Sequence, residues 1–214
     1  DLHLGLMLRE RTLSRVLEQI RHLEPDLLVV TGDLVDAQVN HIERLAGMFV
    51  DLQAPLGKYA VTGNHEVYAG LAQSLDFIGK AGFRILRQET SRPTPGLLLA
   101  GVDDPEVHAE TDEMTLLDSA SEDEFVLLLK HRPEIDPEAS RRFDLQLSGH
   151  AHRGQIFPFN LLTGLAYPRQ DGFYLLASGA RLYTSRGTGT WGPPMRVLSP
   201  PEVTLIELVR PAPD

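Results

Sequence analysis

The feature that most constrains the fold is a series of short apolar runs that each end in polar residues. Residues 27–33 read LLVVTGD and residues 58–66 read KYAVTGNHE, and the same form returns in FVLLLKHRP and FDLQLSGHAH. Short runs rich in valine and leucine are typical of buried parallel strands, and each of these leads into a loop. The chain is therefore predicted to contain parallel sheet.

Helical segments separate the early strands. Apolar residues follow helical spacing up to Pro25, which ends the first helix, and they are Leu13, Val16, Leu17, Ile20 and Leu23. Further helices are predicted from about residue 39 to 52 and from 71 to 81. This alternation predicts an α/β fold. The later strands, which include LLLAGVDDP, FYLLASG and VTLIELV, have fewer helices between them and indicate a second sheet in an αββα four-layer sandwich.

Length and composition limit the class of protein. The 214 residues are 42% apolar, enough for one domain over residues 1–214. A net charge of -10 argues against a non-specific nucleic-acid binder, and the absence of cysteine excludes thiolate sites and cysteine nucleophiles. No apolar run approaches the roughly 20 residues that span a bilayer. A soluble, acidic globular chain is expected.

The first residues, DLHLG, begin without a strand before them. We expect the sandwich to lack its first strand in this chain, and we expect that strand, together with any signal or membrane anchor, to lie upstream.

Polar side chains of the kinds that can bind metals are expected at the carboxyl ends of the strands, including the strand expected before Asp1. They are Asp1, His3, Asp33, Asn64, His65, His131, His150 and His152. Ligands bind beyond the carboxyl ends of strands in open α/β sheets, so these side chains are expected to converge. Side chains alternate between the two faces of an extended backbone. The two outer residues of Asp-x-His or His-x-His therefore point to the same face, where they can bind a metal. Carboxylates and imidazoles without thiolates suit manganese, iron or zinc.

Each of these residues also has an ordinary interpretation. A single histidine at a strand end is usually solvated or hydrogen-bonded, Gly-Asp is often only a turn, and Gly-Asn-His can cap a helix. We assign that ordinary role to His22, His41 and His108, whose contexts are helical or acidic. The glycines at 32, 63 and 149 are expected at sharp turns after strands.

The ordered set DLH, GD, GNHE, KHRP and GHAH resembles the signature of the calcineurin-like metallophosphoesterases, which are two-metal phosphoester hydrolases with an αββα sandwich. This resemblance spans residues 1 to 152. The segments GHAHRGQIFPF, LYTSRGTGTWGPPMR and PPEVTLIEL are similar to the YkuE-like bacterial branch of that family.

The resemblance implies a division of the site residues between two divalent metal ions, with manganese expected first and iron or zinc as alternatives. Asp1, His3 and His152 are implied to bind one metal and Asn64, His131 and His150 the other, with Asp33 bridging them. A metal-bridging hydroxide is then the nucleophile. His65 is implied to donate to the leaving-group oxygen, with Glu66 orienting it.

Other polar residues were assigned from their chemistry. Arg132, Arg153 and Arg196 are candidates for binding phosphate oxygens, against the alternative of ordinary surface charges. Trp191 either stacks on substrate or holds its own loop in place. Asp103 and Asp104 are expected to form a turn, and residues 106–124 an acidic surface with a short helix.

Several functional hypotheses follow. The leading one is a metal-dependent phosphodiesterase, acting on a phosphoester that is nucleotide- or lipid-linked, and associated with the bacterial membrane in the full-length protein. An alternative within the resemblance is an enzyme similar to UDP-2,3-diacylglucosamine pyrophosphatase. From another class, a non-catalytic binding module would keep the sandwich only. A further hypothesis is that a chain starting at Asp1 is inactive, since nothing before it positions the carboxylate and the α-amino charge lies beside the metal.

Overall fold

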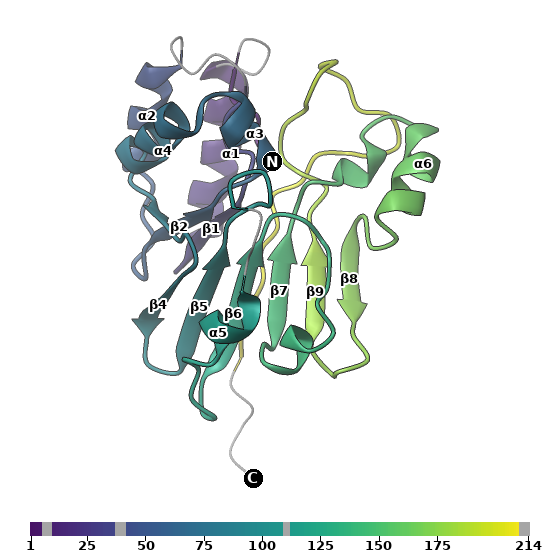
Figure 1. Cartoon of the computed structure of the whole chain (residues 1–214). Helices are drawn as coiled ribbons and strands as arrows, with labels where there is room; N and C mark the ends of the chain where they lie inside the picture. Colours follow the sequence, from purple (N-terminus) through teal and green to yellow (C-terminus); the bar gives the residue numbers. More distant parts are fainter. Residues whose placement is uncertain (6–9, 37–41, 109–111, 210–214) are drawn as a thin grey trace.

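The structure is a computed structural model and describes residues 1–5, 10–36, 42–108 and 112–209. Two sheets lie face to face, with helices on the outer side of each (Figure 1). The predicted αββα sandwich is therefore confirmed.

The smaller sheet is parallel and has the order β1-β2-β3. Its strands are β1 (Leu28–Thr31), β2 (Lys58–Val61) and β3 (Arg84–Ile85). Leu28 lies opposite Lys58, and an isolated parallel bridge joins Leu4 to Val35. The helices of this half are α1 (Glu10–Leu23), α2 (Glu43–Val50), α3 (Asn64–Tyr68) and α4 (Leu71–Lys80).

The larger sheet has the order β4-β5-β6-β7-β9-β8, in which only the pairings of the edge strands β4 and β8 are antiparallel. Its strands are β4 (Glu89–Thr94), β5 (Leu97–Val102), β6 (Phe125–Lys130), β7 (Leu145–Ser148), β8 (Gly172–Leu175) and β9 (Arg181–Thr184). The accompanying helical segments are α5 (Glu113–Leu117), η2 (Ala139–Arg141), η3 (His152–Gly154) and α6 (Phe159–Ala166).

The core is divided into layers because side chains alternate along each strand. On β5, Leu97 and Leu99 face the smaller sheet, whereas Leu98 and Ala100 pack under α5 and η2. A third cluster packs the smaller sheet against its helices, where Leu13 and Leu17 of α1 are fully buried. Both faces of the central strands are thus covered, which explains their continuous apolar runs.

Most of the predicted elements are present, with one exception. The helix predicted from about residue 39 is α2, which begins at Glu43, and residues 37–41 lie outside the described part of the chain. VTLIELV was expected to be a strand, and this prediction is wrong: residues 203–209 form no strand ladder, and Leu205, Leu208 and Val209 are exposed. A β-rich apolar segment becomes a strand only beside another strand to pair with, and this segment pairs with none of the described strands. Among the described helices, none has the length and apolar character required to cross a membrane.

Candidate metal centre

The loops after β1 and β2 of the smaller sheet meet the loops after β6 and β7 of the larger one. The ring nitrogen Nδ1 of His131, just after β6, lies 2.8 Å from the carbonyl oxygen of Thr31, the last residue of β1. All seven predicted ligands come together at this junction, in the groups Asp1, His3 and His152, and Asp33, His131 and His150, with Asn64 beside the second group.

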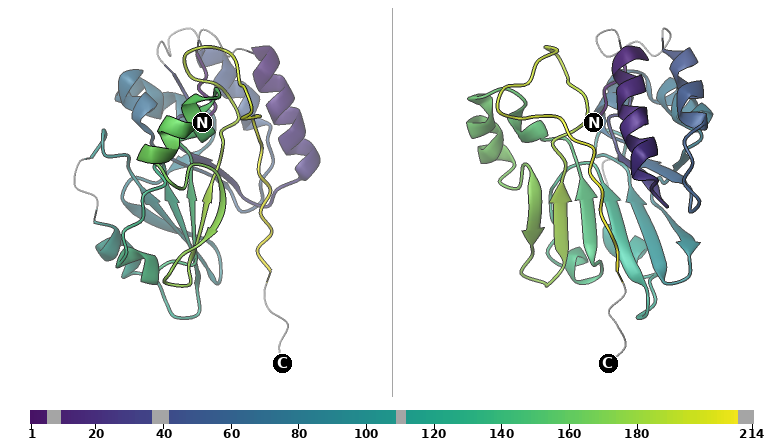
Figure 2. Two further views of the ribbon diagram at one scale, coloured as in Figure 1. Left: turned by 90° about the vertical axis from the view of Figure 1, so that its right-hand side faces the viewer. Right: turned by 180° about the vertical axis from the view of Figure 1, so that it is seen from behind.

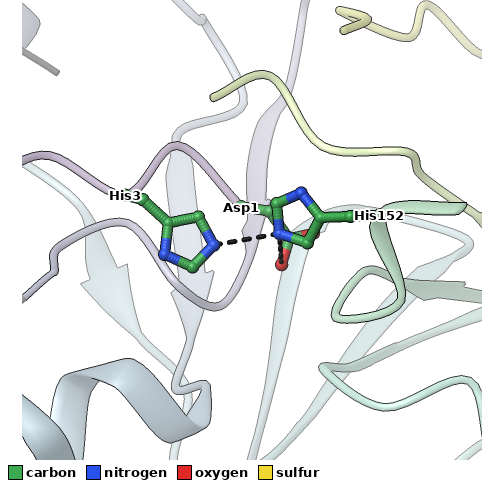
Figure 3. Close-up of side chains that lie close together, drawn as sticks. All are labelled: Asp1, His3 and His152. Atoms are coloured by element: carbon green, nitrogen blue, oxygen red, sulfur yellow. Dashed lines mark hydrogen bonds and ion pairs between the residues drawn. The ribbon is translucent and has the colours of Figure 1, made fainter. Parts of the chain in front are cut away.

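The first group joins Asp1 and His3, at the start of the chain, to His152 (Figure 3). Nε2 of His152 is 2.9 Å from Nε2 of His3 and 3.5 Å from Oδ1 of Asp1. The backbone N–H of His150 donates to both carboxylate oxygens of Asp1 at 2.9 and 3.1 Å, and the α-amino group donates to the carbonyl of Gly32. The expectation that nothing positions the Asp1 carboxylate is therefore wrong.

The second group is equally compact. Oδ1 of Asn64 lies 3.2 Å from Nε2 of His131 and 3.0 Å from Nδ1 of His150. Oδ2 of Asp33 is 3.2 Å from Nε2 of His131 and 3.7 Å from Nε2 of His3, so this carboxylate lies between the two groups. A single carboxylate is thus within reach of both sets of donors.

The backbone is strained at several of these positions. His3, Asp33, His150 and His152 have φ between 50° and 67°, a left-handed conformation that is uncommon for residues other than glycine. Such strain occurs where the surrounding structure fixes a functional geometry. Two glycines permit the close approach: a Cβ at Gly63 would collide with the Asp33 carboxylate, and one at Gly149 with that of Asp1.

The protonation pattern shows that a cation fits this site. Nδ1 of His131 must carry a hydrogen to bond the Thr31 carbonyl, so Nε2 of the neutral ring has only a lone pair, which faces the oxygens of Asp33 and Asn64. Burial lowers the pKa of His131, but the charge of Asp33 outweighs it and raises the pKa above its usual value. This point in the structure therefore favours positive charge, and a divalent cation would attract all three donor atoms.

Burial also keeps the other three histidines of the two donor groups, His3, His150 and His152, in the neutral form. It is the largest cause that lowers the pKa of His3 and of His152 well below the usual range, and it lowers the pKa of His150 to about 3. Neutral imidazole is the form that binds metals. The carboxylate, amide and imidazole donors suit first-row divalent ions, and no cysteine is present to bind a softer one.

His65 lies beside the ligands and is held by a residue that sequence reasoning missed. Its Nδ1 is 3.0 Å from Oδ1 of Asp36, and its ring packs edge-on against His3 at a centroid distance of 4.5 Å. Burial lowers the pKa of His65, but the hydrogen bond to Asp36 and the charge of Asp33 outweigh burial and raise it. Asp36 lies three residues after Asp33, and this short spacing is the signal in the sequence that points to it.

Glu66 was expected to orient His65, and the structure corrects this. Its carboxylate is fully buried and accepts four backbone N–H groups, from Asp33, Leu34, Val35 and Gly63, at 2.7–3.2 Å. The physical reason is that α3 begins at Asn64, so successive side chains turn by about 100° around the helix and Glu66 points away from His65. Glu66 instead joins the loops that carry Asp33 and Asn64.

The three candidate arginines are engaged by other groups. Arg132 donates through Nε and Nη2 to Asp104 at 2.9 and 3.0 Å, which gives Asp104 a role beyond the predicted turn. Arg153 lies 3.5 Å from Asp171. Arg196 donates to the carbonyls of Gly189 and Arg186 and lies 2.9 Å from Nδ1 of His152. Of the three, Arg196 holds its loop against a predicted ligand.

The remaining assignments depend on local contacts. Gln155 holds the loop around Trp191, since its side chain accepts from the backbone N–H of Trp191 at 3.0 Å and donates to the carbonyl of Trp191 at 2.9 Å. Trp191 itself is 51% exposed. His22 and His108 are exposed and His41 lies outside the described residues. The short helix expected in the acidic stretch is α5.

Tyr167 is a second neighbour of the ligands that the sequence gave no reason to select. It follows α6, and its hydroxyl lies 2.9 Å from Nε2 of His150, with the two rings nearly perpendicular. This contact fixes the ring of His150 so that Nδ1 faces Asn64 and His131. Groups that bond the second nitrogen of a metal-binding histidine set its orientation.

Removing the Tyr167 hydroxyl should weaken metal binding at the second group. In Tyr167→Phe the ring packing is kept but His150 loses its partner, and we expect manganese affinity to fall by about 10–100-fold. Calorimetric titration of metal-free protein measures this directly. Tyr68→Phe is the matched control, since Tyr68 is 60% exposed, and equal affinities for the two variants would contradict the role given to Tyr167.

Comparison with known proteins agrees with this geometry. The calcineurin-like phosphoesterase family matches residues 1–154, the part of the chain that carries every predicted ligand. The chain belongs to the calcineurin-like phosphoesterase family. Its membership confirms the resemblance seen in the sequence and makes it a phosphoester hydrolase by family, with metal-dependent chemistry.

Individual relatives cover nearly the whole chain. An uncharacterized metallophosphoesterase of Aquifex aeolicus is 44% identical over 215 residues, covering 97% of this chain and 82% of the relative. The uncharacterized metallophosphoesterase YkuE of Bacillus subtilis is 32% identical, with 97% and 76% covered. A zebrafish (Danio rerio) transmembrane protein with metallophosphoesterase domain is 32% identical, with 97% of this chain but 51% of the relative covered, so the chain spans about half of that protein.

Proposed function

We propose that this chain hydrolyses phosphodiesters at a dinuclear metal centre, with a metal-bridging hydroxide as nucleophile and manganese as the preferred ion. The observation that carries the proposal is the pair of donor groups on either side of Asp33, whose Oδ2 lies 3.2 Å from His131 and 3.7 Å from His3. Asp1, His3 and His152 would hold one ion and Asn64, His131 and His150 the other. Two such ions lower the pKa of a bound water and neutralise charge on the attacking and leaving oxygens.

The protein's own residues supply orientation and a proton. Asp36 fixes the ring of His65 next to His3, where its protonated form donates to the leaving-group oxygen as the bond to phosphorus breaks. Asp104 fixes the guanidinium of Arg132 through hydrogen bonds, and Arg132 directly follows His131 in the sequence. We therefore propose that Arg132 binds a phosphate oxygen of the substrate. Arg153 and Arg196 are given positioning roles instead.

The substrate class is proposed from the family rather than from a pocket. We propose a nucleotide- or lipid-linked phosphoester as substrate and a location at the bacterial membrane, which is supported by the zebrafish relative, a transmembrane protein with a metallophosphoesterase domain. The binding-module hypothesis is disfavoured because the donor groups and His65 are all present and brought together.

Hydrolysis of bis-p-nitrophenyl phosphate and p-nitrophenyl phosphate by metal-free protein, resupplied in turn with manganese, iron(II) or zinc, tests the proposal. We expect manganese-dependent cleavage of the diester that is lost in Asp33→Asn and kept in Asp26→Asn, a control at an exposed aspartate. Protein that binds the metal but cleaves neither compound would instead support the binding module.

Metal removal should also destabilise the fold. The donor atoms of Asp33, Asn64 and His131 face one another at 3.2 Å, and a divalent cation would hold them together more strongly than the single proton that the raised pKa of His131 favours. Manganese at about 100 times its dissociation constant should add about 2.7 kcal/mol to the free energy of unfolding. Thermal unfolding with manganese and with a chelator measures this shift, and a midpoint that does not move would argue against a preformed site.

A further inference from the structure

Helix α6 exposes its large apolar side chains instead of burying them. None of its residues is buried, although it reads FNLLTGLA. We define the α6 face as the helix residues Phe159, Leu161, Leu162 and Leu165 with the preceding Phe157, whose side chains are 49–82% exposed. A helix of a soluble protein normally buries an apolar stripe, and an apolar patch left open marks an interaction site.

The α6 face continues onto neighbouring segments. The backbone N–H of Phe157 donates to Val197, which ties α6 to the loop that carries the exposed Trp191, Met195 and Leu198. Figures 1 and 2 show α6 and the edge strand β8 at the same end of the larger sheet. Phe173 and Leu175 of β8 are 61% and 72% exposed. Aromatic and leucine side chains of this kind insert into the boundary between lipid headgroups and acyl chains.

The segment of the chain that includes the α6 face is positively charged, although the whole chain is acidic. Residues 150–198 contain five arginines, one aspartate and neither lysine nor glutamate, in a chain of net charge -10. Three of the arginines have partners: Arg153 lies 3.5 Å from Asp171, Arg186 is paired with Glu202 just beyond this segment, and Arg196 donates to backbone carbonyls. Arg169 and Arg181 are exposed and form no ion pair within the described part of the chain. This segment is therefore complementary to an anionic surface.

We propose that the α6 face docks on an anionic phospholipid bilayer. A second copy of this chain is a poorer occupant, because a symmetric dimer through this face would bring two arginine-rich segments together. Docking also brings the metal centre to the membrane surface, since Tyr167 follows α6 directly and contacts His150. Phosphoesters at the headgroup level would then be presented to the site.

Co-sedimentation with vesicles tests this docking without any need for turnover. The full chain is mixed with vesicles of phosphatidylcholine alone or with added phosphatidylglycerol, at low and high salt. We expect binding to the anionic vesicles that weakens with salt, and a loss of about tenfold or more in Leu162→Glu/Leu165→Glu. Leu23→Glu/Val50→Glu is the matched control, since both residues are exposed in the helices over the smaller sheet and the charge change is the same.

Three results would overturn the proposal. They are no binding of the unaltered chain to anionic vesicles, equal binding by the two double variants, and dimerisation that the α6 double variant alone abolishes while no vesicle binding is seen. Diester hydrolysis in solution is measured on the same samples. If the α6 double variant loses vesicle binding but keeps diester hydrolysis, the variant is folded and the loss of binding is due to the α6 face. If hydrolysis is lost but vesicle binding is kept, the result concerns the proposed function and not the docking.

Discussion

Replacing His65 by alanine is expected to lower kcat for a diester by about 10²–10⁴-fold while the metal content stays unchanged. His65 is outside the proposed ligand set, and its contacts are with Asp36, at 3.0 Å, and with the edge of the His3 ring. Losing the ring removes the proposed proton donor to the leaving oxygen but none of the donors that hold the ions. Steady-state kinetics together with metal analysis of the same preparations separates the two effects.

Asp36→Asn and His22→Ala complete this experiment. The asparagine keeps the size of the Asp36 side chain but weakens the charge-assisted bond to His65, so a smaller loss of about tenfold in kcat is expected. His22 is exposed on α1, and its alanine variant should match the unaltered chain. If His65→Ala retains kcat within about threefold, the proton-donor role is wrong, because general acid catalysis normally contributes far more.

Replacing Glu66 by glutamine is expected to lower the free energy of unfolding by about 3 kcal/mol or more. The buried carboxylate accepts two N–H groups on each oxygen, and an amide nitrogen in place of one oxygen would face two donors with no acceptor. Urea unfolding monitored by circular dichroism measures the change.

Glu122→Gln is the control for Glu66, since Glu122 is exposed and its substitution should change the free energy of unfolding by less than about 0.5 kcal/mol. Near-equal stabilities of the two variants would mean that Glu66 is not the tie between the loops of Asp33 and Asn64. A loss of activity in Glu66→Gln without a loss of stability would instead restore the catalytic role expected from the sequence.

The metal donors were accessible to sequence reasoning for a simple physical reason. Each follows an apolar run, and the ends of parallel strands meet at one edge of a sheet, so the order of strands and loops was enough to predict convergence. The structure brings all seven together. The same logic failed for residues 203–209, because an apolar, β-rich segment shows that a strand is possible but not that the edge of a neighbouring strand is available.

The residues around the donors could not be assigned in this way. Asp36, Tyr167 and Asp104 act through contacts with His65, His150 and Arg132, and such contacts depend on side-chain direction and on the approach of distant segments. Glu66 was misassigned because neighbours in sequence point in different directions on a helix.

The sequence by itself determined the class of fold, the family and the candidate ligands that meet at one site, because periodicity and short motifs are local properties that survive without coordinates. Only the tertiary structure decided which acid holds His65, which hydroxyl orients His150, and that α6 leaves its leucines in solvent. An apolar helix has the same sequence pattern whether it is covered or open, so its exposure is known only once every neighbouring segment has been placed.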